Sequence, residues 1–123
     1  MSVFVPFKAY RPTKENAKAV ACKPYDVLNA KEAKQEAEGN PVSFYNVIKP
    51  EINFPEGSNY YAPEVYLKGK ENFDSLVSDN IIRQDHSNSF YVYELTMDGH
   101  VQTGLVGCCA IEDYFNNTIK KHE

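Results

Sequence analysis

Residues 89–110 read SFYVYELTMDGHVQTGLVGCCA, and this stretch decides the fold. Asp98-Gly99 separates two runs of alternating character. Both central residues of a type I′ turn need a positive φ, which Asp and Gly tolerate, so the stretch predicts an antiparallel β-hairpin. The predicted register sets two aromatic rings opposite glycines. It pairs Met97 with His100, Tyr93 with Gly104 and Phe90 with Gly107.

Shorter signals precede and follow this hairpin. Residues 3–7 form a short apolar run that predicts a strand, and residues 42–48 are rich in strand-forming side chains. Asn29 and Glu32 match a capping box, which predicts a helix that stops before Gly39. Residues 111–115 are typical of a turn or helical start. Helices and strands alternate irregularly, so we expect an α+β fold with a mixed, largely antiparallel sheet, a carboxy-terminal hairpin and two or three helices on it.

A second helix is predicted to begin at Pro63, which suits the first helical turn. Its apolar side chains recur at helical spacing and form one face. That face comprises Ala62, Tyr66, Gly69, Phe73 and Leu76, with Val65 beside them. Glycine costs ~1 kcal/mol of helix propensity, so we expect Gly69 to let a neighbouring backbone approach closely.

Length and composition predict one domain spanning residues 1–123. Hydrophobic residues make up 42% of the chain, which argues against disorder, yet no apolar run approaches the length of a membrane span. The start of the sequence lacks the features of a signal peptide. Three cysteines, two of them adjacent, make a poor disulfide framework. We therefore expect a cytoplasmic protein without a membrane partner.

The net charge of -4 argues against general binding to nucleic acid. The charge is uneven, however, because the residues up to Lys23 include five basic side chains and one acidic one. This basic segment is compatible with an anionic small-molecule partner. Solvated surface lysines explain it equally well.

The end of the chain, Thr118-Ile119-Lys120-Lys121-His122-Glu123, follows a strong hairpin signal without a cap or polar tail. We interpret the sequence as the amino-terminal part of a longer protein. A carboxylate beside an imidazole suits acid-base work or a metal. Adjacent strand residues point to opposite sides, so at most one of His122 and Glu123 would face a given site.

Two further groups carry side chains suited to binding. Residues 6–12 place Lys8 and Arg11 in a stiff segment between two prolines, and arginine binds carboxylate or phosphate in a bidentate manner. A solvated edge strand is the alternative. In residues 23–27, Tyr25 can anchor a ligand and Asp26 can bind a cation, although an Asx-turn or a cap explains Asp26 as well.

Several motifs of catalysis are absent from the sequence. It contains no phosphate-binding glycine loop, no Cys-x-x-Cys, no His-Glu-x-x-His and no Gly-x-Ser-x-Gly. His86 and His100 are expected at the surface. Cys108-Cys109 lie on a predicted strand, and we expect buried cysteine packing rather than a nucleophile.

Eight short motifs, in the same order, resemble the prokaryotic family known as domain of unknown function ten-fifteen. The resemblance covers nearly the whole chain. The motifs are Pro6-Phe7-Lys8-Ala9-Tyr10-Arg11-Pro12, Pro24-Tyr25-Asp26-Val27, Asn40-Pro41-x-Ser43-Phe44, Val47-Ile48-Lys49-Pro50-Glu51, Tyr91-Val92-Tyr93, Thr103-Gly104-Leu105-Val106-Gly107, Glu112-Asp113-Tyr114 and Ile119-Lys120-Lys121-His122-Glu123.

The resemblance implies a longer protein that handles a nucleotide or phosphorylated small molecule. Family members continue into an Asp-Gly-His-His-Arg motif, which is similar to one in ParB-like and sulfiredoxin-like proteins that include nucleotide-dependent kinases of free serine. It thus implies serine-related phosphoryl transfer, with ATP or ADP and magnesium as cofactors of the full-length protein. This chain lacks that motif, because its own Asp98-Gly99-His100 is followed by Val101.

Three hypotheses follow for the function. In the leading one, Lys8, Arg11 and Tyr25 bind an anionic ligand, Asp26 and Glu123 act as a base or as magnesium ligands, and His122 acts in acid-base chemistry. In the second, the chain is a non-catalytic interaction module that pairs with a partner chain or self-associates through an uncovered sheet edge or apolar face. A DNA-associated domain is a third, which the acidic balance opposes.

Overall fold

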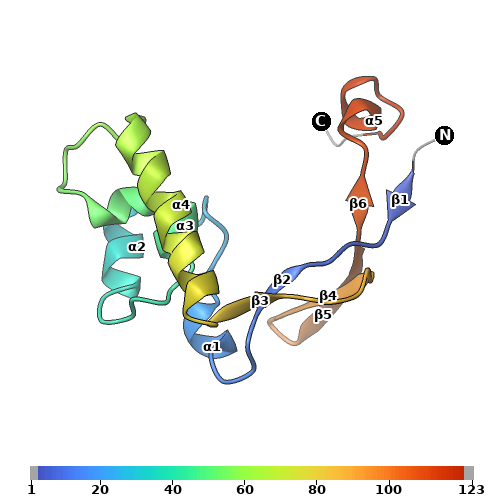
Figure 1. The fold of residues 1–123 in the computed structure, drawn as a ribbon, viewed down its shortest axis with the longest axis horizontal. Coiled ribbons are helices and arrows are strands. Elements are labelled where there is room, and N and C mark those ends of the chain that lie inside the picture. The colour runs from blue at the N-terminus through green and yellow to red at the C-terminus, as the bar shows by residue number, and fades with distance from the viewer. Residues whose placement is uncertain (1–2, 121–123) are drawn as a thin grey trace. The chain divides into compact units, whose positions relative to one another are not determined.

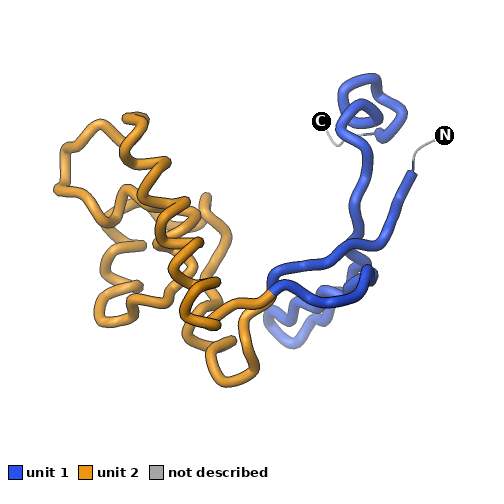
Figure 2. Tube along the Cα trace, in the orientation of Figure 1, with its two compact units in different colours: residues 1–10, 84–123 blue, residues 11–83 orange. Residues whose placement is uncertain are grey.

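The computed structural model describes residues 3–120, which form an α+β fold divided into two compact units (Figures 1 and 2). Unit 1 takes the described residues up to Tyr10 and from Gln84 onward, and unit 2 takes Arg11–Arg83. The chain passes between the units within β2 (Tyr10–Pro12) and β3 (Ile82–Gln84), which pair with each other. Among the described residues, no helix is long and apolar enough to cross a membrane.

The hairpin predicted from Asp98-Gly99 is the main feature of unit 1. It joins β4 (Tyr91–Met97) to β5 (His100–Val106), and the positive φ angles of Asp98 (53°) and Gly99 (77°) fit a type I′ turn. The register confirms two predicted pairs, Met97 with His100 and Tyr93 with Gly104.

The third predicted pair lies beyond the hairpin ladder, which ends at Tyr91 and Val106. The ring that covers Gly107 is that of Phe4, whose nearest atom lies 2.6 Å from the position of an added Cβ. Phe90 stacks on Phe4 with ring centroids 5.3 Å apart. Gly107 therefore does admit an aromatic ring, but the ring comes from β1.

The remaining strands of unit 1 are short. β1 (Phe4–Val5) pairs antiparallel with β6 (Cys108–Cys109), and α5 (Ile111–Phe115) follows. The Tyr91 hydroxyl donates to the Asp85 carboxylate at 2.6 Å and accepts from the Ala9 N–H at 3.0 Å. These contacts hold the amino-terminal segment beside the start of β4.

Unit 2 consists mainly of helices around two small apolar clusters. Its elements are α1 (Ala17–Val20), α2 (Ala30–Glu36), α3 (Tyr45–Ile48), the 3₁₀ helix η1 (Pro50–Asn53) and α4 (Pro63–Ser78). One cluster is built on Val20, Leu76 and Ile82, and the other on Ala33, Tyr45 and Ile52.

The strand predicted for residues 42–48 is wrong, because the segment ends in the helical turn α3. A helical turn sends Tyr45 and Ile48 to one cluster and Phe44 and Val47 to the other. A strand would set Asn46 on the same side as Phe44 and Ile48. In the helical turn Asn46 instead hydrogen-bonds the Ser43 carbonyl at 3.1 Å.

The expectation for the adjacent cysteines needs correction. The cysteines Cys108 and Cys109 are both exposed free thiols, because β6 is a two-residue strand that no described layer covers. Tyr66, on the predicted apolar face of α4, lines one cavity with Gly69 and Phe73 but is 61% exposed. The buried side of that helix runs through Val65, Gly69 and Leu76. The strands form three two-stranded sheets among the described residues.

The predicted capping box of α2 is confirmed. The Glu32 N–H donates to the Asn29 side chain at 2.9 Å, and the Asn29 N–H donates to the Glu32 carboxylate at 3.0 Å. Replacing Asn29 with Ala should lower the free energy of unfolding by ~1 kcal/mol, because an N–H at the helix start loses its acceptor. Urea unfolding followed by circular dichroism measures this change. Asn29→Ser, which keeps an acceptor, should retain most of the stability, and equal losses in the two variants would contradict the prediction.

Candidate functional site

The sequence-predicted ligand residues are distributed over both units. Lys8 belongs to unit 1, where it is exposed and its carbonyl accepts a hydrogen bond from the Gln84 side chain at 3.2 Å. Arg11, in β2, belongs to unit 2 and is also exposed. His122 and Glu123 lie outside the described residues.

Tyr25 and Asp26 occupy an exposed turn in unit 2, closed by the Val27 N–H on the Pro24 carbonyl at 3.1 Å. Tyr25 is 66% exposed. Lys23, the residue before this turn, makes two contacts. Its N–H donates to the Tyr45 hydroxyl at 3.2 Å, and its ammonium group forms an ion pair with Glu36 at 3.2 Å. The turn is thus anchored at its base, while its two candidate side chains stay in solvent.

Burial and the nearby carboxylate of Glu36 also change the pKa values of two side chains next to Lys23, those of Tyr45 and Cys22. Burial, followed by a hydrogen bond with Glu36, raises the pKa of Tyr45 above its ordinary value of 10.0. Burial and the Glu36 charge likewise raise the pKa of the Cys22 thiol. Both groups therefore stay protonated near neutral pH, which suits a structural role and not a nucleophilic one.

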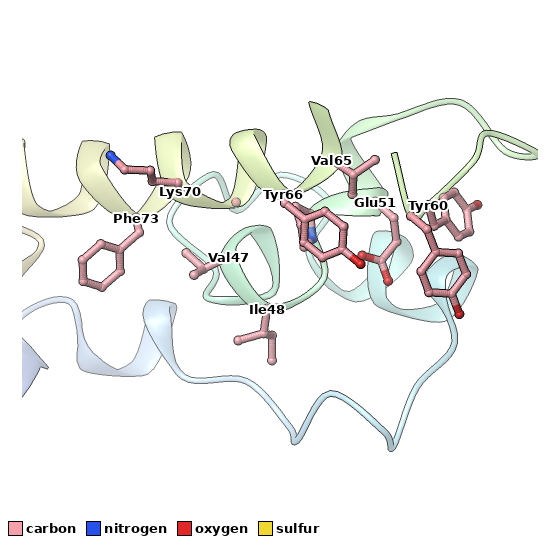
Figure 3. Close-up of a pocket in the computed structure, with 11 residues that line it drawn as sticks. Val47, Ile48, Glu51, Tyr60, Val65, Tyr66, Lys70 and Phe73 are labelled. Atoms are coloured by element: carbon pink, nitrogen blue, oxygen red, sulfur yellow. The ribbon is translucent and has the colours of Figure 1, made fainter. Parts of the chain in front are cut away.

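A cavity of about 490 Å³ lies in unit 2 between α4 and the segment that contains α3 and η1 (Figure 3). Most of its walls are apolar or aromatic. Pockets of this size and lining hold small organic molecules. The lining residues are Val47, Ile48, Pro50, Glu51, Tyr60, Tyr61, Val65, Tyr66, Gly69, Lys70 and Phe73.

The floor of the cavity is formed where α4 approaches η1 most closely. A Cβ added to Gly69 would lie 3.1 Å from the Val47 carbonyl oxygen and 3.2 Å from Cγ of Pro50. The prediction that Gly69 admits a neighbouring backbone is therefore confirmed. A glycine in α4 and a buried proline in η1 thus meet at the floor of the cavity, where a larger side chain at residue 69 has little space.

Glu51 supplies the acidic group of the cavity, and its side chain is 18% exposed. Its carboxylate lies 3.7 Å from the ammonium group of Lys49, whose side chain is 12% exposed. This separation exceeds that of a short charge-assisted hydrogen bond. In the view of Figure 3 the Glu51 side chain is drawn between those of Tyr66 and Tyr60, which also line the cavity.

Lys70, the basic residue of the cavity, is more exposed than Glu51. Lys70 lines the cavity but is exposed, and its ammonium group binds the Asp74 carboxylate at 2.6 Å. An incoming anion would have to compete with Asp74 for this lysine. Glu51 and Lys70 thus each have an ion-pair partner, and the Glu51 pair is the longer and less exposed of the two.

Two further cavities of about 420 Å³ each flank α2. Lys31 and Lys34 line both of them, and each cavity also contains at least one glutamate. The opposed charges make neither cavity an evident anion site. Within residues 3–120, no group of three or more metal-ligating side chains is close enough to hold a metal ion.

Sequence reasoning missed the residues of the main cavity. Glu51 was noted only as the end of a motif, and of the three tyrosines only Tyr66 was noted, as part of a helical face. The one available signal was Gly69 within an aromatic helical face, which indicated a close approach between elements but not which segment would meet it.

A family model described as "Protein of unknown function (DUF1015)" matches residues 4–123. No curated protein and no solved structure gives a significant match. The motifs that resembled this family are thus supported by a match over nearly the whole sequence, and the chain belongs to the DUF1015 family.

Proposed function

We propose that unit 2 binds a small organic molecule with an aromatic or aliphatic body and a cationic or hydrogen-bond-donating group. The observation that carries the proposal is the cavity of about 490 Å³, whose lining combines apolar side chains, three tyrosines and Glu51. Apolar walls supply most of the affinity of such a site, and a few polar groups fix the orientation of the ligand.

The charge of Glu51 supports an amine as the donor group. Its carboxylate is 18% exposed and has one cation, Lys49, at 3.7 Å, so a primary amine would add a second and closer partner. The aromatic faces of Tyr60, Tyr61 and Tyr66 also attract cations. An amine with a flat apolar body therefore matches both features of the cavity.

The anionic ligand expected from the sequence would use other residues, namely Lys8 and Arg11. That hypothesis, with its nucleotide, magnesium and serine-related phosphoryl transfer, rests on the family resemblance and stays a prediction. Serine itself carries an ammonium group, so it belongs in a test of the cavity. Phosphoserine and ATP with magnesium test the anionic alternative in the same experiment.

The test uses three probes with one ring and different polar groups: phenethylamine, phenethyl alcohol and phenylacetate. Chemical-shift titration should place the amine at the cavity residues and give the order amine, alcohol, acetate. A charge-assisted hydrogen bond that contributes ~1 kcal/mol makes the amine about fivefold tighter than the alcohol. Glu51→Gln should remove this preference while leaving binding of the alcohol nearly unchanged.

Glu64→Gln is the matched control, because Glu64 is an exposed carboxylate in the first turn of α4 that does not line the cavity. It should leave all three titrations as in the unaltered chain. The proposal fails if shifts from the amine are spread over both units, or if Glu64→Gln weakens amine binding as much as Glu51→Gln. Binding of phosphoserine or ATP alone would favour the anionic alternative.

A further inference from the structure

Unit 1 leaves most of its large apolar side chains in contact with solvent. The buried hydrophobic residues that the structure describes all belong to unit 2. On the hairpin, Val92 is 72% exposed, Leu95 53% and Leu105 61%. A two-stranded hairpin is marginally stable by itself in water, so this surface favours the addition of further strands or a covering layer.

Both long edges of the hairpin are unpaired among residues 3–120. In a two-residue hairpin the residues that flank the turn, Met97 and His100, form a hydrogen-bonded pair, and the pairing type then alternates. The residues of β5 that belong to the non-hydrogen-bonded pairs therefore turn their N–H and C=O groups away from β4, toward the open edge. These residues are Val101, Thr103 and Leu105.

The two edges differ in charge. Edge strands are usually protected against further pairing by lysine, other charges or proline, and β5 (HVQTGLV) contains none of these. The middle of β4 carries Glu94, which belongs to the outward-turned set of that strand. Two copies paired through β4 about this centre would set two glutamates directly opposite each other, which is unfavourable.

The sequence of β5 is self-complementary about its centre. When β5 is set antiparallel to a second β5 with Thr103 on the two-fold axis, Thr103 faces itself and Val101 faces Leu105 of the other copy. Threonine pairs stabilise neighbouring strands, and the two Val101–Leu105 pairs set apolar side chains beside each other. Because the outward-turned residues are the ones that meet in this register, their backbone groups can exchange hydrogen bonds.

We propose that two copies of this chain associate through β5, antiparallel and about Thr103, into a four-stranded sheet. The arrangement is isologous, so it closes as a dimer and leaves no β5 edge open. It also joins the exposed side chains of Val92, Val101 and Leu105 from both copies on one face. The inference does not depend on ligand binding in unit 2.

The decisive variant is Thr103→Lys. Within its own hairpin the new lysine lies opposite Glu94, an opposite-charge pair that favours the hairpin. In the dimer the two lysines meet at the axis. Sedimentation velocity from micromolar to submillimolar concentration should show a monomer–dimer equilibrium for the unaltered chain. The variant should have a dissociation constant at least about tenfold higher.

Thr96→Lys is the matched control, because Thr96 points to the same face but lies on β4, away from the proposed axis. It should dimerise as the unaltered chain does. Thr103→Pro is a second variant, which removes an outward N–H without removing a bond between β4 and β5, and it should also weaken dimerisation. Nuclear Overhauser contacts between β4 and β5 verify that each variant keeps the hairpin.

Three results would overturn the proposal. One is an unaltered chain that stays monomeric throughout the concentration range. Another is open-ended aggregation in place of a closed dimer. The third is an equal loss of association in Thr96→Lys and Thr103→Lys, which would indicate nonspecific association of the apolar surface instead of pairing through β5.

Discussion

Replacing Tyr45 with alanine should destabilise unit 2 by about 4 kcal/mol, which is the scale of removing a large buried aromatic side chain. Tyr45 is 2% exposed and packs with Ala33 and Ile52. Its loss would leave a hole in the cluster that packs α2, α3 and η1 together. Urea unfolding followed by the amide spectra of unit 2 measures the change.

Tyr45→Phe separates the ring from its hydroxyl group. The hydroxyl accepts the Lys23 N–H at 3.2 Å, and losing that bond should cost ~1 kcal/mol while the cluster stays filled. The phenylalanine variant should therefore retain most of the stability that the alanine variant loses. Similar losses in the two variants would mean that the hydrogen bonds of this hydroxyl, and not ring burial, hold the cluster together.

The features predicted correctly from the sequence are those that local chemistry determines. Asp98-Gly99 specifies a turn of one hand, so the hairpin register follows from a few residues. The capping box of α2 is similarly contained within four residues, Asn29 to Glu32. Such signals remain readable because their partners are neighbours along the chain.

Residues 42–48 show why other elements were not predictable. Their side chains favour a strand in isolation, but Phe44 and Tyr45 are needed in two different clusters. The helical turn that satisfies both depends on α2, η1 and α4, which lie at different distances along the sequence. Tertiary contacts override local propensity here, and a single sequence does not reveal them.

The cavity of unit 2 was hidden for a related reason. It is assembled from α3 and η1, the loop with Tyr60 and one side of α4, and no motif links these segments. The side chains singled out from the sequence, such as Arg11 and Asp26, were chosen for their chemistry and line none of the three cavities described above. A cavity lined by ordinary apolar residues and tyrosines becomes visible only when their arrangement is known.

Replacing Gly69 with leucine should destabilise unit 2 by at least about 2 kcal/mol. A Cβ alone would lie 3.1 Å from the Val47 carbonyl oxygen and 3.2 Å from Pro50, and the remaining atoms of leucine would have no space there. The gain in helix propensity, ~1 kcal/mol, offsets only part of this cost. Thermal and urea unfolding followed by circular dichroism measure the difference.

Two variants isolate the cause of that loss. Gly69→Ala gains the same propensity with one carbon atom in close contact, so its stability should stay within about 1 kcal/mol of the unaltered chain. Ser75→Leu adds leucine at an exposed position of α4 and should change stability by no more than about 0.5 kcal/mol. If Gly69→Leu proved as stable as Ser75→Leu, α4 would have to move away from η1, and the floor of the cavity would not be rigid. A large loss confined to Gly69→Leu would instead mean that this glycine sets the distance between α4 and η1 at the floor of the cavity.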